Sequence, residues 1–104
     1  MKPQDMNIKG ATQPEIFQGV VDEMVAALLT DPEAFWQKAL DEDGLVEVWE
    51  INGERFLFNG NHRYQAASRA GVEIPDSMVD IKNQSGSNIP TFYFHQMVWM
   101  PGVK

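Results

Sequence analysis

The sequence predicts one α+β domain in which helices pack on a small mixed β-sheet. Apolar residues recur at helical spacing in the first third of the chain, and the pair Asn52-Gly53 separates two segments of strand composition. An alanine-rich helix is expected after the second of these segments. At 104 residues, with 43% hydrophobic and 11% aromatic residues, the chain can form one modest core, so we expect a single domain over residues 1–104.

The first half is expected to contain two helices. Residues 1–12 show no sustained periodicity and are predicted to be an extended lead-in. Pro14 suits the opening turn of a helix over 14–29, and Asp31-Pro32 repeats this start for a helix over 32–41 that ends at Asp43-Gly44. The apolar positions that indicate these helices are Ile16, Phe17, Val20, Val21, Met24, Val25 and Leu28, and then Phe35, Trp36, Ala39 and Leu40.

A β-hairpin is expected next, with strands over residues 45–51 and 54–58. Asn-Gly is the preferred two-residue turn of a hairpin, and a turn this tight also sets the register. It pairs Ile51 with Glu54, Glu50 with Arg55, Trp49 with Phe56 and Val48 with Leu57. Since both faces of the hairpin carry apolar residues, it is expected to lie inside a mixed sheet.

The remaining elements follow the hairpin in order. A helix over 61–70 contains Ala66 and Ala67, which allow close packing, and it stops at Gly71. A short strand is expected over 78–81, a polar loop over 83–88 and a last strand over 91–98.

Composition excludes several classes of function. The chain has no cysteine, which rules out disulfides and cysteine-bound metals, and the two histidines lack the spacing of a zinc site. The net charge of −7 argues against a broad basic surface for duplex DNA. There is no apolar run long enough to span a membrane and no secretory pattern, so we expect a cytoplasmic site of action, whether the chain acts alone or as the C-terminal part of a longer exported protein.

The charge is unevenly distributed along the chain. Between Glu15 and Glu54 the acidic residues are frequent, and Lys38 is the one base. From Arg55 onward the bases outnumber the acids. The simplest interpretation is that the acidic half forms a helix face exposed to solvent. The alternative is that it forms a contact surface for a partner protein.

The segment Asn59-Gly60-Asn61-His62-Arg63 is the candidate site. A strand is expected to end here, a glycine to turn the chain and a helix to begin, and a helix N-terminus favours anions. Arg63 suits bidentate phosphate binding, and histidine transfers protons near neutral pH. We therefore predict Gly60, Asn61 and Arg63 as phosphate-binding residues, and His62, Arg63 and Asn59 as catalytic residues.

Each of these residues also has a purely structural interpretation. Asn59 and Asn61 are favoured at turns and caps, and Arg63 could form a surface salt bridge. Gln13 and Glu15 open the first expected helix, where they either cap it or approach the ligand. His95 is expected to be a packed histidine in the last strand, and Trp36, Trp49 and Trp99 are expected in the core, with the alternative that they stack on bases.

The strands around Asn52-Gly53, followed by Asn59-Gly60-Asn61-His62-Arg63 and a helix with Ala66-Ala67, resemble the ParB/sulfiredoxin superfamily. Its members carry a motif of the form Asp-Gly-x-His-Arg-x-x-Ala-Ala at the strand-to-helix turn. The resemblance extends from Gln13 to Ile81. It is closest to the ParB-like nuclease domains of bacterial polymorphic and contact-dependent toxins.

This resemblance implies that the chain handles nucleotides or phosphate groups. Gly60 then allows close backbone approach, Arg63 binds phosphate, and His62 is a second phosphate contact or a proton carrier. Asn59 stands where many members have Asp, and an amide is neither a general base nor a strong magnesium ligand. Asn61 takes the place of the catalytic cysteine of sulfiredoxin, which excludes sulfiredoxin activity.

The leading hypothesis is a toxin effector domain that binds phosphate and cleaves phosphodiester bonds of nucleic acid. The alternatives are an NTP-dependent phosphotransferase or NTPase, and a non-catalytic module that binds a nucleotide or a protein. The expected cofactor is Mg²⁺ held mainly by a nucleotide. The expected partners are a nucleic acid or nucleotide substrate and an immunity protein, which would suit the apolar segment from Met97 to Pro101.

Overall fold

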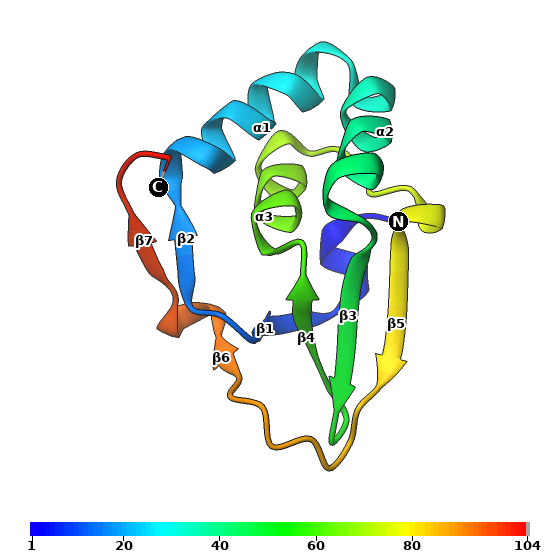
Figure 1. Ribbon diagram of the computed structural model, residues 1–104, viewed down its shortest axis with the longest axis vertical. Helices are drawn as coiled ribbons and strands as arrows, with labels where there is room; N and C mark the ends of the chain where they lie inside the picture. Colours follow the sequence, from blue (N-terminus) through cyan, green and yellow to red (C-terminus); the bar gives the residue numbers. More distant parts are fainter. Residues whose placement is uncertain (104) are drawn as a thin grey trace.

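The computed structural model describes residues 1–103 (Figure 1). These residues form three α-helices, a mixed five-stranded sheet and a separate two-stranded sheet. The predicted α+β domain with helices packed on a small mixed sheet is therefore confirmed at that level.

The five-stranded sheet has the strand order β5-β3-β4-β1-β6. Its strands are β1 (Ile8–Ala11), β3 (Val46–Ile51), β4 (Glu54–Asn59), β5 (Val79–Asn83) and β6 (Phe92–Tyr93). β3 and β4 form the antiparallel hairpin, β5 and β1 lie parallel on either side of it, and β6 is antiparallel to β1. The predicted hairpin register is confirmed in all four pairs, and Arg55 Nε lies 3.1 Å from Glu50 Oε2 across the strands.

The expectation of an extended lead-in over residues 1–12 is wrong. Pro3–Met6 form a short 3₁₀ helix, η1, and Ile8–Ala11 form β1, an inner strand between β4 and β6. Met6 is fully buried and Ala11 is 1% exposed. A four-residue strand has too few positions to show periodicity, and its partners are distant in sequence, so the sequence carried no local signal for it.

The predicted helix over 14–29 begins later than expected. Glu15–Phe17 form strand β2, which pairs in parallel with β7 (Val98–Met100) near the C-terminus, and α1 runs from Gln18–Thr30. Ile16 is fully buried in the strand, and it would also be buried in a helix. The spacing of apolar residues around Ile16 therefore could not distinguish a strand from a helix. The backbone partner near the other end of the chain decided the conformation; Figure 1 shows β2 and β7 side by side.

The expected last strand over 91–98 is also divided. β6 is followed by a 3₁₀ turn, η3 (Phe94–Gln96), and then by β7. In η3 the Tyr93 backbone N–H donates to Gln96 Oε1 at 2.8 Å, which closes a local turn between the two strands. His95 lies in this turn and is exposed, so the expectation of a packed histidine within a strand is wrong.

The other helices follow the sequence prediction closely. α2 spans Pro32–Asp43, and Asp31 Oδ1 accepts the Ala34 backbone N–H at 3.2 Å as an N-cap. α3 spans Asn61–Ala70, the predicted bounds, and ends at Gly71 in the left-handed conformation. Another 3₁₀ turn, η2 (Asp76–Met78), leads into β5.

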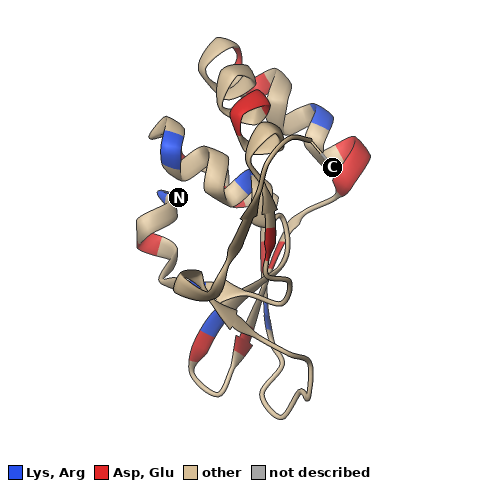
Figure 2. Cartoon of the chain, turned by 90° about the vertical axis from the view of Figure 1, so that its left-hand side faces the viewer, with Lys and Arg blue, Asp and Glu red and all other residues tan. Residues whose placement is uncertain are grey.

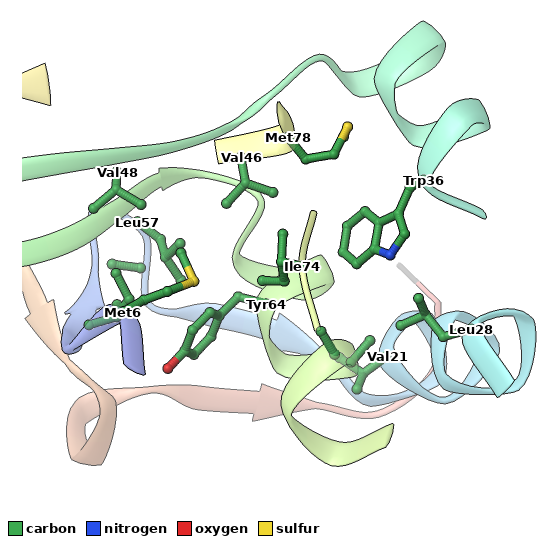
Figure 3. Close-up of a cluster of buried hydrophobic side chains, with 14 of the residues drawn as sticks. Met6, Val21, Leu28, Trp36, Val46, Val48, Leu57, Tyr64, Ile74 and Met78 are labelled. Atoms are coloured by element: carbon green, nitrogen blue, oxygen red, sulfur yellow. The ribbon is translucent and has the colours of Figure 1, made fainter. Parts of the chain in front are cut away.

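The core lies between one face of the five-stranded sheet and the helices (Figure 3). Ala66 and Ala67 of α3 are fully buried, so this helix packs closely, as predicted. Trp36 of α2 is 5% exposed and belongs to the core, while Trp49 is half-buried and Trp99 is 38% exposed. The largest fully buried side chains are Met6, Ile16, Leu28, Leu57, Ile74, Val21, Val46 and Val48.

Acidic segments gather on the helices in the upper part of the molecule (Figure 2). Within residues 1–103, no helix is long and apolar enough to cross a membrane.

Candidate functional site

The turn from β4 into α3 brings the predicted site residues together. Gly60 has φ = 98°, a left-handed conformation that side chains rarely adopt. A Cβ atom at this position would lie 3.1 Å from Val46 Cγ2, so the turn requires glycine for its backbone and for its space. No side chain caps the N-terminus of α3, and the first helical bond runs from Tyr64 N to Gly60 O at 2.8 Å. The helix thus presents an uncapped N-terminus.

Two cavities border this turn, and Asn59, Gly60, Asn61 and His62 line both of them. The larger one has a volume of about 370 Å³, and Arg63, Asp43, Val20 and Met24 complete its lining. The smaller one, of about 160 Å³, is also lined by Thr12, Gln13, Glu15 and Phe58. Gln13 and Glu15 therefore approach the turn, although the segment that brings them there is a loop and strand β2 rather than the predicted helix.

Arg63 is only 2% exposed and is bonded to the loop that joins α2 to β3. Its Nη1 donates to Gly44 O at 2.7 Å and its Nη2 to Leu45 O at 3.4 Å. Burial lowers the pKa of the guanidinium, and the nearby charge of Asp43 opposes that shift. None of the ion pairs among residues 1–103 involves Arg63. Its hydrogen bonds go to the carbonyl oxygens of Gly44 and Leu45, and the charge of Asp43 acts on it without a direct ion pair.

Asn59 bonds to the same loop. Its Nδ2 donates to Asp43 O at 2.9 Å and to Leu45 O at 3.0 Å. A carboxylate at this position could not donate and would face two carbonyl oxygens. The contacts therefore give a physical reason for an amide rather than a carboxylate at position 59.

His62 ties α3 to strand β2. Its Nε2 accepts the backbone N–H of Phe17 at 3.0 Å, and the two rings stack with centroids 6.1 Å apart. Since Nε2 accepts this bond, a neutral His62 carries its proton on Nδ1.

Asn61 is the first residue of α3 and has an unpaired acceptor. Its Nδ2 donates to Gln13 O at 3.4 Å and lies 4.0 Å from Met97 Sδ. Its Oδ1 is buried and has no hydrogen-bond partner among residues 1–103. A buried acceptor without a donor is costly, so a ligand hydroxyl or amine that reached it would be stabilised.

Two residues that line these cavities have no functional signal in the sequence. From the sequence, Asp43 is predicted only to end α2, and Phe58 is predicted only to lie in a strand. Asp43 reaches the larger cavity only through the folding of a distant segment onto the turn, whereas Phe58 directly precedes Asn59 in the chain. Within residues 1–103, no three His, Asp or Glu side chains lie close enough together to hold a metal ion.

The observed class is thus an α+β domain with a mixed five-stranded sheet and a helix N-terminus open to two cavities. Comparison with protein-family models, with curated proteins and with solved structures gave no significant match.

Proposed function

We propose that the chain is a ParB/sulfiredoxin-like domain that binds a phosphate group of a nucleotide or nucleic acid at the N-terminus of α3. The observation that carries this proposal is the combination of an uncapped ten-residue helix with the buried charge of Arg63 directly beneath the turn. The helix dipole and the guanidinium act in the same direction, and both favour an anion over Gly60.

Arg63 acts in this proposal as a fixed charge behind the turn. Its hydrogen bonds hold the loop carbonyls of Gly44 and Leu45, and its Nη2 lies 3.3 Å from the position of a Cβ on Gly60. Water screens this charge weakly because the side chain is buried. Its field therefore reaches the turn without a direct salt bridge to the ligand.

Two carboxylates, Glu15 and Asp43, line the cavities and would repel a phosphate dianion. They fit the usual mode of Mg²⁺ binding, in which one or two carboxylates and the phosphates of the substrate supply the ligands. When bound, Mg²⁺ would neutralise part of the phosphate charge. Asp43 lines the larger cavity and Glu15 the smaller one, so either would contribute one carboxylate beside the phosphates of the substrate.

The proposed reaction is phosphodiester cleavage by a toxin effector acting in the cytoplasm of a target cell. His62 is the histidine that lines both cavities. When water attacks phosphorus and the ester bond breaks, the leaving oxygen requires a proton. His62 can supply it only as the imidazolium, so its Nε2 must first release the Phe17 N–H and take up a proton. NTP hydrolysis or phosphoryl transfer would use the same phosphate site and the same histidine. An immunity protein is the proposed partner, and Val98, Trp99 and Met100 of β7, which are 38% to 50% exposed, offer it an apolar surface.

Non-catalytic nucleotide binding is the second candidate. It is favoured by the donors of Asn59 and Arg63, which are bonded to the loop carbonyls of residues 43–45. In that case the turn would bind phosphate without groups that promote its transfer.

A titration with inorganic phosphate tests the binding site. In ¹⁵N-labelled protein, the amide signals of Gly60 and Asn61 should move with saturation, while chloride at equal ionic strength should not move them. Replacing Arg63 by Met should weaken the binding because the fixed charge is lost. If the amide signals do not respond to phosphate, the proposed site is wrong.

Expression in bacteria tests the reaction. The wild type should stop growth and degrade nucleic acid, whereas His62→Gln should do neither. The side-chain oxygen of the introduced glutamine can still accept the Phe17 N–H, so this variant removes the proton carrier and preserves the contact with β2. If the wild type binds phosphate, and cells expressing it grow normally with intact nucleic acid and nucleotide pools, the enzymatic proposal fails and the binding module remains.

A further inference from the structure

An aromatic pair lies next to the turn from β4 into α3. Trp49 of β3 and Phe58 of β4 stack with ring centroids 4.1 Å apart and an interplanar angle of 1°. The indole N–H of Trp49 donates to Glu47 Oε2 at 2.6 Å, and Lys82 Nζ donates to Glu47 Oε1 at 3.1 Å. These bonds hold the indole in place, so Phe58 rests on a fixed support.

Phe58 remains 42% exposed although Trp49 covers one face of its ring. Phe58 is also one of the residues that line the smaller cavity, together with Asn61 and His62. Phe58 therefore offers an exposed aromatic ring next to the cavity that borders the N-terminus of α3.

This cavity encloses only part of a ligand. Its volume is about 160 Å³. Typical small-molecule pockets start at about 300 Å³. Its lining is mostly polar and includes Thr12, Gln13, Glu15 and Asn61. These polar groups can form hydrogen bonds with the hydroxyls of a sugar. The flat base attached to that sugar would then lie outside the cavity, on the ring of Phe58.

We propose that Phe58, supported by Trp49, is the stacking platform for the base of one unpaired nucleotide whose phosphate lies at the N-terminus of α3. The inference rests on the proposed phosphate site. One sugar separates the base from the phosphate in a nucleotide, and two residues of a tight turn separate Phe58 from Asn61. Bases of every kind have a π face, so such a platform accepts purines and pyrimidines. A paired base is unsuitable because its faces are covered within the duplex.

Isothermal titration calorimetry with probes that add one nucleotide component at a time tests the platform. The probes are inorganic phosphate, ribose 5-phosphate, adenosine 5′-monophosphate and a single-stranded trinucleotide. In the wild type the monophosphate should bind about tenfold more tightly than ribose 5-phosphate, which corresponds to one base–aromatic stack. This comparison uses the wild type alone, so it does not depend on the folding of any variant.

Variants of Phe58 test whether its ring provides the tenfold gain in affinity. Phe58→Leu keeps an apolar side chain and should bring the two affinities together, while Phe58→Tyr should preserve the difference. Tyr93→Leu is the matched control because Tyr93 is 40% exposed on the same sheet but does not line the cavity. It should leave the difference unchanged.

The outcomes separate the two proposals. If wild type binds neither inorganic phosphate nor ribose 5-phosphate, the phosphate site itself is refuted, and the platform with it. If ribose 5-phosphate binds but the base adds nothing, or Phe58→Leu keeps the full gain, only the platform is refuted. Tighter binding of the trinucleotide than of the monophosphate supports a single strand as the source of the base, and equal binding supports a free nucleotide.

Discussion

Replacement of Arg63 gives the sharpest test of the site. The bond from Nη1 to Gly44 O, at 2.7 Å, is charge-assisted and contributes about 1.5–3 kcal/mol, while the 3.4 Å contact to Leu45 O contributes less. Arg63→Ala also leaves space where the buried stem lay, so its free energy of unfolding should fall by about 3 kcal/mol. Arg63→Met fills most of that space and removes a buried charge, so it should lose about half as much.

Urea unfolding followed by tryptophan fluorescence measures these differences, since the chain has three tryptophans. Arg69→Ala is the matched control on the same helix. Arg69 is exposed, and its guanidinium lies 4.6 Å from the Trp99 ring centroid, so its loss should cost no more than about 1 kcal/mol. Equal losses for Arg63→Ala and Arg69→Ala would refute the claim that Arg63 holds the loop.

Phosphate links the stability of the protein to the proposed function. At a phosphate concentration of about 100 times the dissociation constant, the wild type should gain about 2.7 kcal/mol in its free energy of unfolding. Arg63→Met should gain much less because the fixed charge behind the turn is absent. If Arg63→Met gains as much as the wild type, the buried charge does not contribute to anion binding.

Three further predictions concern the fold around the site. Gly60→Ala should lower the free energy of unfolding by about 2–3 kcal/mol, against about 1 kcal/mol for Gly71→Ala, because both need a left-handed residue but only Gly60 has neighbours within 4 Å of the added Cβ. Gly10→Ala should lower the melting temperature, since its Cβ would lie 1.8 Å from Phe92 O between β1 and β6; an unchanged melting temperature would contradict that pairing. Glu47→Gln should flatten the loss of stability in acid, measured by urea unfolding between about pH 3 and pH 7. The hydrogen bond from Trp49, and then Lys82, lower the pKa of Glu47 from 4.5, so its contribution is present above pH 4.5 and is lost as the pH falls through the lower folded value. If Glu47→Gln loses as much stability as the wild type when the pH falls, this prediction is contradicted.

The elements with local sequence signals could be predicted before the structure was known. The Asn52-Gly53 turn sets the β3–β4 register because a two-residue loop leaves no freedom for the strands to slip. α3 has its predicted bounds because Gly60 and Gly71, at its two ends, both adopt left-handed conformations. The turn that places Gly60, Asn61 and His62 together is part of the same local pattern.

The elements that depend on distant partners could not be predicted in this way, because their conformation follows from the folding of the whole chain. Residues 8–11 and 15–17 are strands because β4, β6 and β7 supply their hydrogen-bond partners, and short segments carry no periodicity of their own. The same reason applies within the site. The sequence predicted Arg63 and Asn59 at the turn, but it could not predict that their side chains donate to the carbonyl oxygens of residues 43–45. These hydrogen bonds form only when the loop after α2 lies against the turn between β4 and α3.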